Sequence, residues 1–330
     1  MSIKDARETA SASLRRGDPV SVRSLDEILA TLDADAKLEG LPFMPEMVPY
    51  CGKTFRVYRR AEKTCVEGVG VRSMKNTVFL DGLRCDGAAH GGCQRGCLFF
   101  WKEAWLREEG GGRKAEGGRD EIQLSNISNP QSLVPDSSVH HSSFIIHHSS
   151  QLPTTKADRF YCQSTELPGA TFDLPPGKLG HYLHDLQLGE ITLRRFGYML
   201  WLAFTNRLWR MLHGRGFYQL TGQQKQTLSE ELDLRPGELV EIKSPAEIEA
   251  TLDAQGRNRG LSFEPEMAQH CGRRYRVATP VRAIIAEQTG KMVKLTNTVI
   301  LEGLICQGIC AKNCPRANFF YWRDIWLKRV

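Results

Sequence analysis

The sequence predicts an α+β protein built from two tandem copies of one small module. Six stretches within residues 17–107 recur within residues 237–328, and the register needs a single inserted residue. The clearest pair is NTVFLDGLRC at Asn76–Cys85 and NTVILEGLIC at Asn297–Cys306. Short apolar runs bounded by turn residues predict strands in each copy, and one capped run predicts a helix. We therefore expect each copy to be one folding unit, used twice.

The first half of each module is expected to be a strand followed by a short helix. GDPVSV at Gly17–Val22 alternates apolar and polar residues after a turn, which indicates a strand. Ser24 can cap the helix begun by LDEILATLD, with Glu27 as its capping-box partner three residues later. Ser244 and Glu247 repeat this arrangement in the second copy.

The second half of the module is expected to contain two strands and a terminal helix. TFRVYRR at residues 54–60 and NTVFLDGL at residues 76–83 predict strands, separated by a turn that contains Gly68 and Gly70. FFWKEAWLR at residues 99–107 carries aromatic residues at helical spacing and predicts a short helix. We expect four tryptophans of the two copies to pack these elements onto their modules: Trp101, Trp105, Trp322 and Trp326.

The opening strand of each module suggests a barrel. A strand that begins G-[DE]-x-V, as at Gly17–Val20 and Gly237–Val240, and precedes short hairpins resembles SH3-like barrels of the KOW-type and nitrile hydratase β-subunit families. The resemblance implies two tandem SH3-like β-barrel modules with added helices, and a role in binding partners or nucleic acid. The inserted helix, the GL-x-F-x-PEM loop and the cysteines do not belong to that family pattern.

Composition divides the chain into five segments. We expect a polar leader, a Cys-rich module one, a disordered low-complexity linker, a helical segment and a Cys-rich module two. The linker contains GGGRKAEGGR and two HHSS repeats, for which a His-rich metal tract is the alternative interpretation. The boundaries of the five segments are residues 1–16, 17–109, 110–157, 158–234 and 235–330.

Within the helical segment, Phe196–Leu212 is apolar nearly all round and is expected to form a continuous helix. It contains Arg207 and Arg210 and is shorter than the ~20 apolar residues that a membrane span needs. Packing against a module or a partner is the expected arrangement. The alternative is a helix lying in a membrane surface, with Trp201 and Trp209 at headgroup depth.

The overall composition bounds the partners and the compartment. The 330 residues carry a formal charge of +6 without a block of basic residues, so nucleic acid is not indicated and a protein partner is expected. The N-terminus lacks the apolar core of a secretory signal, which predicts a cytoplasmic protein, with membrane association left open. Clustered cysteines in a reducing compartment favour metal binding over disulfides.

The cysteine cluster of module one is RCDGAAHGGCQRGC, which contains Cys85, His90, Cys93 and Cys97. Cys65 lies upstream, where a hairpin can bring it next to Cys85. Four thiolates of this kind suit Zn²⁺, and an iron–sulfur cluster is the alternative. If Cys65 is out of reach, His90 becomes the fourth ligand.

Module two has a diverged cluster, CQGICAKNC, with Cys306, Cys310 and Cys314. It lacks counterparts of Cys65, His90 and Cys97, and Cys271 is the nearest candidate for a fourth ligand. We expect this second metal site to be weaker than the first.

The sequence contains no recognisable catalytic motif, so three classes of function remain. The first is a metal-stapled tandem-module binding or scaffold protein, accessory to a larger pathway. The alternatives are an iron–sulfur protein in electron transfer or a redox enzyme, and an enzyme with a site between the two modules. The shared PEM loops contribute Glu46 and Glu266, for which a loop-packing role is expected.

Overall fold

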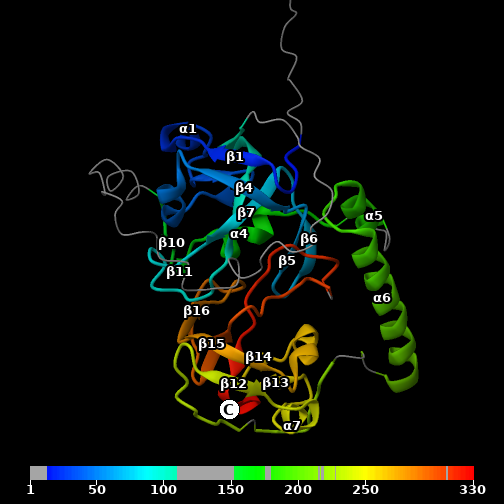
Figure 1. Cartoon of the computed structure of the whole chain (residues 1–330). Coiled ribbons are helices and arrows are strands. Elements are labelled where there is room, and N and C mark those ends of the chain that lie inside the picture. Colours follow the sequence, from blue (N-terminus) through cyan, green and yellow to red (C-terminus); the bar gives the residue numbers. More distant parts are fainter. Residues whose placement is uncertain are drawn as a thin grey trace, which may run out of the picture.

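Both modules are mixed α/β units, each built around one antiparallel sheet (Figure 1). The computed structural model describes residues 13–109, 152–174, 180–214, 216, 219–226, 228–309 and 311–330. The elements of module one are β1 (Pro19–Val22), α1 (Leu25–Leu29), β2 (Lys37–Leu38), β3 (Leu41–Pro42), η1 (Pro45–Tyr50), β4 (Thr54–Arg60), β5 (Lys63–Val66), β6 (Gly70–Ser73), β7 (Thr77–Arg84), β8 (Leu98–Lys102), η2 (Glu103–Trp105) and β9 (Leu106–Glu108). The elements of module two are β12 (Leu239–Ile242), α7 (Pro245–Glu249), β13 (Arg257–Asn258), β14 (Leu261–Ser262), η4 (Pro265–His270), β15 (Arg274–Pro280), β16 (Ala283–Ile285), β17 (Met292–Lys294), β18 (Thr298–Leu301), β19 (Trp322–Arg323), η5 (Asp324–Trp326) and β20 (Leu327–Arg329).

The two sheets have the same strand order, which confirms that the repeat is one folding unit used twice. The order is β8-β7-β4-β1-β9 in module one and β19-β18-β15-β12-β20 in module two. Neighbouring strands within each sheet are antiparallel. One of the two sheets curls into a half-barrel.

The short helix of each module begins as the sequence predicts. Ser24 Oγ accepts a hydrogen bond from the Glu27 amide at 3.4 Å, and the Glu27 carboxylate accepts one from the Ser24 amide at 3.1 Å. The corresponding distances at Ser244 and Glu247 are 3.4 and 2.8 Å. These capping boxes satisfy amide groups that the first helical turn leaves without partners.

The predicted terminal helix is wrong. The stretch forms β8, the 3-10 turn η2 and β9 instead, because β8 pairs with β7 and all five of its residues are buried. A strand that is buried on both faces is apolar at every position and lacks the alternation of a half-buried strand. Aromatic residues three or four positions apart in such a run can therefore be mistaken for one face of a helix. The tryptophans do pack onto their own modules as expected, with Trp101, Trp105, Trp322 and Trp326 fully buried.

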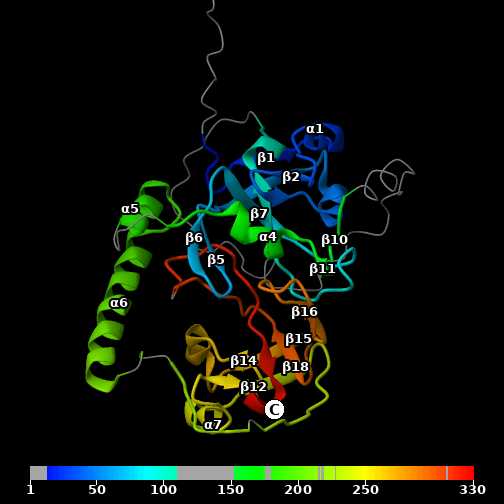
Figure 2. The same cartoon turned by 180° about the vertical axis from the view of Figure 1, so that it is seen from behind.

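Each module sends one hairpin onto the other. We predicted a simple turn at Gly68 and Gly70, but the chain forms the hairpin β5–β6, and β16–β17 is its counterpart in module two. The Cys65 amide on β5 donates to Cys314 Sγ at 3.2 Å, and the Ile285 amide on β16 donates to Cys93 Sγ at 3.3 Å. The contacts are therefore reciprocal, and Figures 1 and 2 show β5, β6 and β16 in the region between the two modules.

The modules also share a hydrophobic core. The main buried cluster of module one continues into side chains of module two, including Ile305, Ala317 and Phe319. A second cluster fills the rest of module two around Trp322 and Trp326. The two repeats are therefore packed together through buried apolar surface.

The segment between the modules contains β10 (Thr155–Lys156), β11 (Arg159–Phe160), α4 (Gln163–Ala170), α5 (Gly180–Gln187) and α6 (Leu193–His213). Residues 155–156 were expected in the disordered linker but pair with β11. The continuous helix predicted at 196–212 is confirmed within α6. No helix among the described residues is long and apolar enough to cross a membrane.

Two expectations about this segment are wrong, and others concern residues that the structure does not describe. The predicted burial of α6 against a module is wrong, because Trp201 and Phe204 are 59% and 68% exposed, and packing against a partner stays a prediction. In the part of 219–234 that the structure describes, no helix forms. Residues 1–12, and 110–151 with the HHSS repeats, lie outside the described residues.

Candidate functional site

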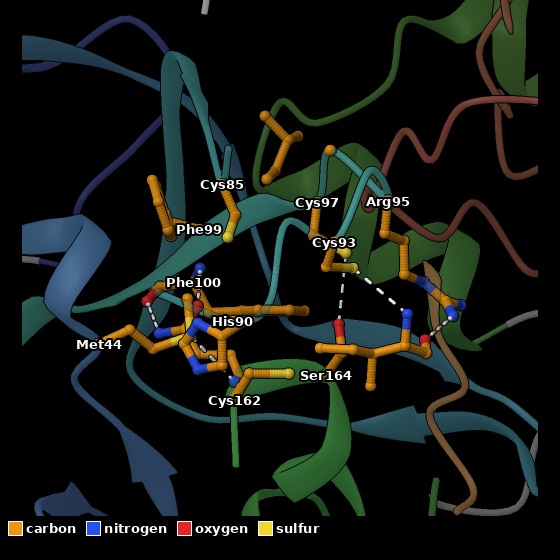
Figure 3. A pocket seen from close by; sticks show the side chains of 14 residues that line it. Met44, Cys85, His90, Cys93, Arg95, Cys97, Phe99, Phe100, Cys162 and Ser164 are labelled. Carbon is orange, nitrogen blue, oxygen red and sulfur yellow. Dashed lines mark hydrogen bonds between the residues drawn. The ribbon is translucent and has the colours of Figure 1, made fainter. Parts of the chain in front are cut away.

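Four cysteines line one small cavity in module one (Figure 3). They are Cys85 at the end of β7, Cys93 and Cys97 on the loop that follows, and Cys162 at the N-cap of α4. The cavity has a volume of about 30 Å³, and its other lining residues are largely apolar. The structure thus brings together the three cysteines predicted from the loop and adds a fourth from the inter-module segment.

Glycine shapes the loop that carries these cysteines. Gly87 has φ +71°, and a Cβ placed there would lie 2.1 Å from the Cys93 carbonyl oxygen. Gly308 at the same place in module two has φ +70° and would clash in the same way with Cys314. A residue with a side chain would be strained here and would also displace the backbone. The two loops therefore share this turn geometry despite their different cysteines.

Backbone amides point at the cysteine sulfurs of both loops. Cys93 Sγ accepts from the Ile285 amide at 3.3 Å, and Cys306 Sγ accepts from the Gly308 amide at 3.4 Å. Burial raises the pKa of the Cys85 thiol, which a hydrogen bond from the Gly87 amide partly offsets. Such donors stabilise a thiolate, which is the form of cysteine that binds metal.

The thiols of the first site lie within electrostatic range of one another. Burial raises the pKa of Cys85, Cys93 and Cys162, and the charge of Cys97 raises each of them further. For Cys162 the pKa rises to about 12. Burial therefore favours the protonated thiols of Cys85, Cys93 and Cys162, and a bound cation would reverse that preference.

His90 is held by two hydrogen bonds. Its Nδ1 lies 2.5 Å from Glu46 Oε1, and its Nε2 lies 2.9 Å from the Tyr161 carbonyl oxygen. Both acceptors require N–H groups on the ring, which favours imidazolium. Burial alone would lower the pKa of His90, but the bond and charge of Glu46 raise it. Both ring nitrogens are therefore engaged in this arrangement. To act as the predicted metal ligand, His90 would have to give up one of these two hydrogen bonds.

Glu46 and Glu266 hold the cysteine loops, as expected. Glu46 accepts from the Ala89 amide at 3.1 Å, and Glu266 accepts from the Gln307 amide at 2.7 Å. Each glutamate thereby fixes the start of the loop in its own module.

We predicted that Cys65 joins Cys85, but Cys65 lies beside module two instead. Its thiol donates to Cys314, which lowers the pKa of Cys314 to about 6 and raises that of Cys65. Cys306 is close enough that its charge raises the pKa of Cys65 further. Hairpin exchange thus supplies the second cysteine loop with the thiol that its own module lacks. Cys310 lies outside the described residues.

An ionic cluster separates the two cysteine loops. Glu287 pairs with the guanidinium groups of Arg316 and, at 3.1 Å, Arg95. Arg95 donates to the Ile285 carbonyl at 2.9 Å, and Arg316 donates to the Cys65 carbonyl at 2.7 Å. These equivalent arginines each bind the hairpin of the opposite module. These hydrogen bonds help to hold each hairpin against the opposite module.

Arg316 is electrostatically linked to both groups of thiols. Burial alone would lower its pKa, but Glu287 above all, followed by Cys97 and Cys314, raises it. The Arg316 guanidinium therefore lies within electrostatic range of Cys97 on one loop and Cys314 on the other.

A second cavity, which we name the arginine pocket, lies between the modules beside Cys306 and Cys314. Its volume is about 160 Å³, and it is mostly polar. Its charged and polar lining residues include Arg16, Arg59, Glu190, Thr192, Arg195 and Gln307.

Sequence reasoning missed Cys162 and the destination of Cys65. Cys162 lies 65 residues beyond Cys97 in a segment without a repeat counterpart, and the chain gives no local signal for it. Among the described residues, no group of three or more His, Cys, Asp or Glu side chains is arranged around a single metal ion. The chain matches no protein-family model, no curated protein and no solved structure.

Proposed function

We propose that the protein is an iron–sulfur protein that carries electrons between two cluster sites. The observation that carries this proposal is the grouping of four thiols around one cavity, with backbone amides directed at their sulfurs. Thiolate ligands and hydrogen bonds to sulfur are what hold a cluster and set its reduction potential. The first site comprises Cys85, Cys93, Cys97 and Cys162.

A single Zn²⁺ and an iron–sulfur cluster require different spacings of the four sulfurs. Four sulfurs around one zinc each lie ~2.3 Å from it, so they must converge on a point. A cubane cluster binds each thiolate through a different iron, and its ligands stand further apart. The cavity has a volume of about 30 Å³, so a cluster would need the Gly-rich loop to move outward.

The second site would be held by Cys65, Cys306 and Cys314, with Cys310 as the fourth ligand. Cys310 is proposed from the sequence alone, because it lies outside the described residues. In this arrangement each site takes three cysteines from one loop and the strand before it. The fourth comes from a distant part of the chain, as Cys162 in the first site and Cys65 in the second. The earlier expectation of a weaker second site loses its basis, since Cys65 replaces the missing ligand.

The ionic cluster between the loops supports electron exchange. Both Cys97 and Cys314 interact electrostatically with the one buried guanidinium of Arg316. A fixed positive charge at that place would stabilise the reduced state of either cluster. An SH3-like fold for each module, and a cytoplasmic location that keeps the thiols reduced, remain part of the proposal.

Anaerobic purification with quantification of iron, zinc and acid-labile sulfide tests the proposal. We expect iron and sulfide in near-equal amounts, together with a broad visible absorption that bleaches on reduction. Cys162→Ser should lower the iron content by about half while leaving the second site loaded. Cys51→Ser is the matched control, because Cys51 is a half-buried cysteine that does not line the cavity.

Two results would refute the proposal. Zinc without sulfide would support the metal-stapled scaffold in its place. Equal iron in the Cys162→Ser and Cys51→Ser variants would show that the described cavity does not bind the cluster.

A further inference from the structure

The arginine pocket is strongly biased toward positive charge. Three guanidinium groups line it, from Arg16, Arg59 and Arg195, and Glu190 is the one acidic residue among the described lining. Glu190 is already engaged, since its carboxylate accepts from Arg59 Nε at 3.2 Å and from the Arg60 amide at 3.0 Å. Arg16 and Arg195 have no acidic partner among the described lining residues, and the opposing charges that reach them come from outside it, from Asp81 to Arg16 and from Glu266 to Arg195.

Arg195 has unused hydrogen-bonding capacity in this pocket. One terminal nitrogen donates to the Gln307 carbonyl at 2.8 Å, but its Nε is buried without a hydrogen-bond partner. A buried donor without an acceptor is costly, so an occupant that accepts this bond would be stabilised.

The start of α6 adds to the same field. Thr192 caps this 21-residue helix and lines the pocket, so the positive end of the helix dipole faces the arginines. Helix N-termini and guanidinium groups both bind oxyanions, the latter often through two parallel hydrogen bonds.

We propose that the arginine pocket binds a small anionic molecule through a phosphate or carboxylate group. Arg195 and Arg59 would hold the oxyanion, with Arg16 closing the solvent side. The pocket borders Cys306 and Cys314, so such a ligand would lie next to the second thiol group. The proposal rests on the arginines and the cavity, and it holds whether or not a metal binds nearby.

Isothermal titration of the full chain with inorganic phosphate and with malonate, in chloride-free buffer, tests the pocket. We expect one of the two to bind, which also identifies the anion class. Arg195→Gln should weaken binding by about tenfold or more, the equivalent of about 1.4 kcal/mol. Arg194→Gln is the matched control, since Arg194 is the exposed neighbour on the same helix.

Arg16→Gln provides a second variant, because Arg16 is exposed and we expect its loss to leave folding intact. Its effect should be smaller than that of Arg195→Gln but in the same direction. No binding of either anion by the wild type, or equal binding by the Arg195→Gln and Arg194→Gln variants, would overturn the proposal.

A separate observation concerns α6, whose outer face is apolar. Its inner face carries the buried Met199. Exposed large apolar side chains recur along the outer face with helical spacing, and the helix contains no acidic residue. These exposed side chains are Leu193, Trp201, Phe204, Leu208, Met211 and Leu212.

Charge indicates what covers this face. Arg194, Arg207 and Arg210 are exposed on α6, so the apolar stripe is accompanied by positive charge alone. An apolar face with arginines and without carboxylates complements an anionic lipid surface. Figures 1 and 2 show α6 along the outside of the molecule, where a flat surface can reach it.

We infer that α6 docks on the surface of an anionic membrane without crossing it. Co-sedimentation of the full chain with phosphatidylcholine vesicles, with and without phosphatidylserine, tests this. We expect binding to the phosphatidylserine vesicles, weakened about tenfold or more by Phe204→Ser. Leu228→Ser is the control, since Leu228 is 63% exposed but lies outside α6.

Absence of binding to anionic vesicles would overturn the inference. So would a wild-type dimer, seen by light scattering, that Phe204→Ser converts to a monomer, because a second copy would then cover the face.

Discussion

Glu287 is predicted to hold the two modules together, and Glu287→Gln should destabilise the protein strongly. The Glu287 carboxylate is 3% exposed and faces Arg316 and Arg95. Removing one partner of a buried pair costs about 3–5 kcal/mol, because the remaining charge stays buried without compensation. The amide keeps an oxygen that accepts hydrogen bonds, and Arg316 retains its bond to the Cys65 carbonyl at 2.7 Å. We therefore expect the low end of that range, about 3 kcal/mol.

Glu67→Gln is the matched control, because Glu67 occupies the equivalent position in module one. Its side chain is 47% exposed and lies 3.4 Å from Arg95, so its loss should cost about 0–1 kcal/mol. Urea unfolding followed by tryptophan fluorescence reports both changes, since Trp101 and Trp322 are fully buried. If Glu287→Gln and Glu67→Gln lose the same stability, the ionic cluster does not fasten the modules.

Three further predictions concern single residues. Burial and then Arg273 lower the pKa of His270 to about 4, so neutral His270 stabilises the fold above pH ~6.5, and this contribution is lost as the pH falls toward 4. His270→Tyr, which installs the residue of module one, should flatten urea stability over that pH range, and an unchanged slope would contradict this assignment. Cys65→Ser should reduce the iron content of the second site and leave the first site loaded. A Cys65→Ser, Cys162→Ser double variant should therefore retain less iron than either single variant. Gly87→Ala should destabilise the cysteine loop by more than Gly92→Ala, since both glycines have positive φ but only the Gly87 Cβ would meet backbone, and thermal melting of the two variants compares them.

The repeat made the local structure predictable. The capping boxes at Ser24 and Ser244 depend on residues three apart, and the loop cysteines lie within thirteen residues of one another. Such short-range constraints can be read directly from the chain. Identical stretches in two copies also restrict each module to one strand order.

Long-range contacts were not predictable in the same way. Cys65 pairs with Cys314 because a hairpin leaves its own module, and nothing near Cys65 marks that departure. The misassigned terminal helix has another cause: β8 is buried on both faces, so it lacks the alternation that identifies a half-buried strand. An exposed α6 was only the alternative expectation, because a helix that is apolar nearly all round usually lies inside a protein.

Anomalous diffraction at the iron edge, from crystals grown anaerobically, tests the central claim most directly. The account predicts iron density within the cavity bounded by Cys85, Cys93, Cys97 and Cys162, and a second peak beside Cys65 and Cys314. Density for a single zinc ion, or cysteines that remain free at both places, would contradict it.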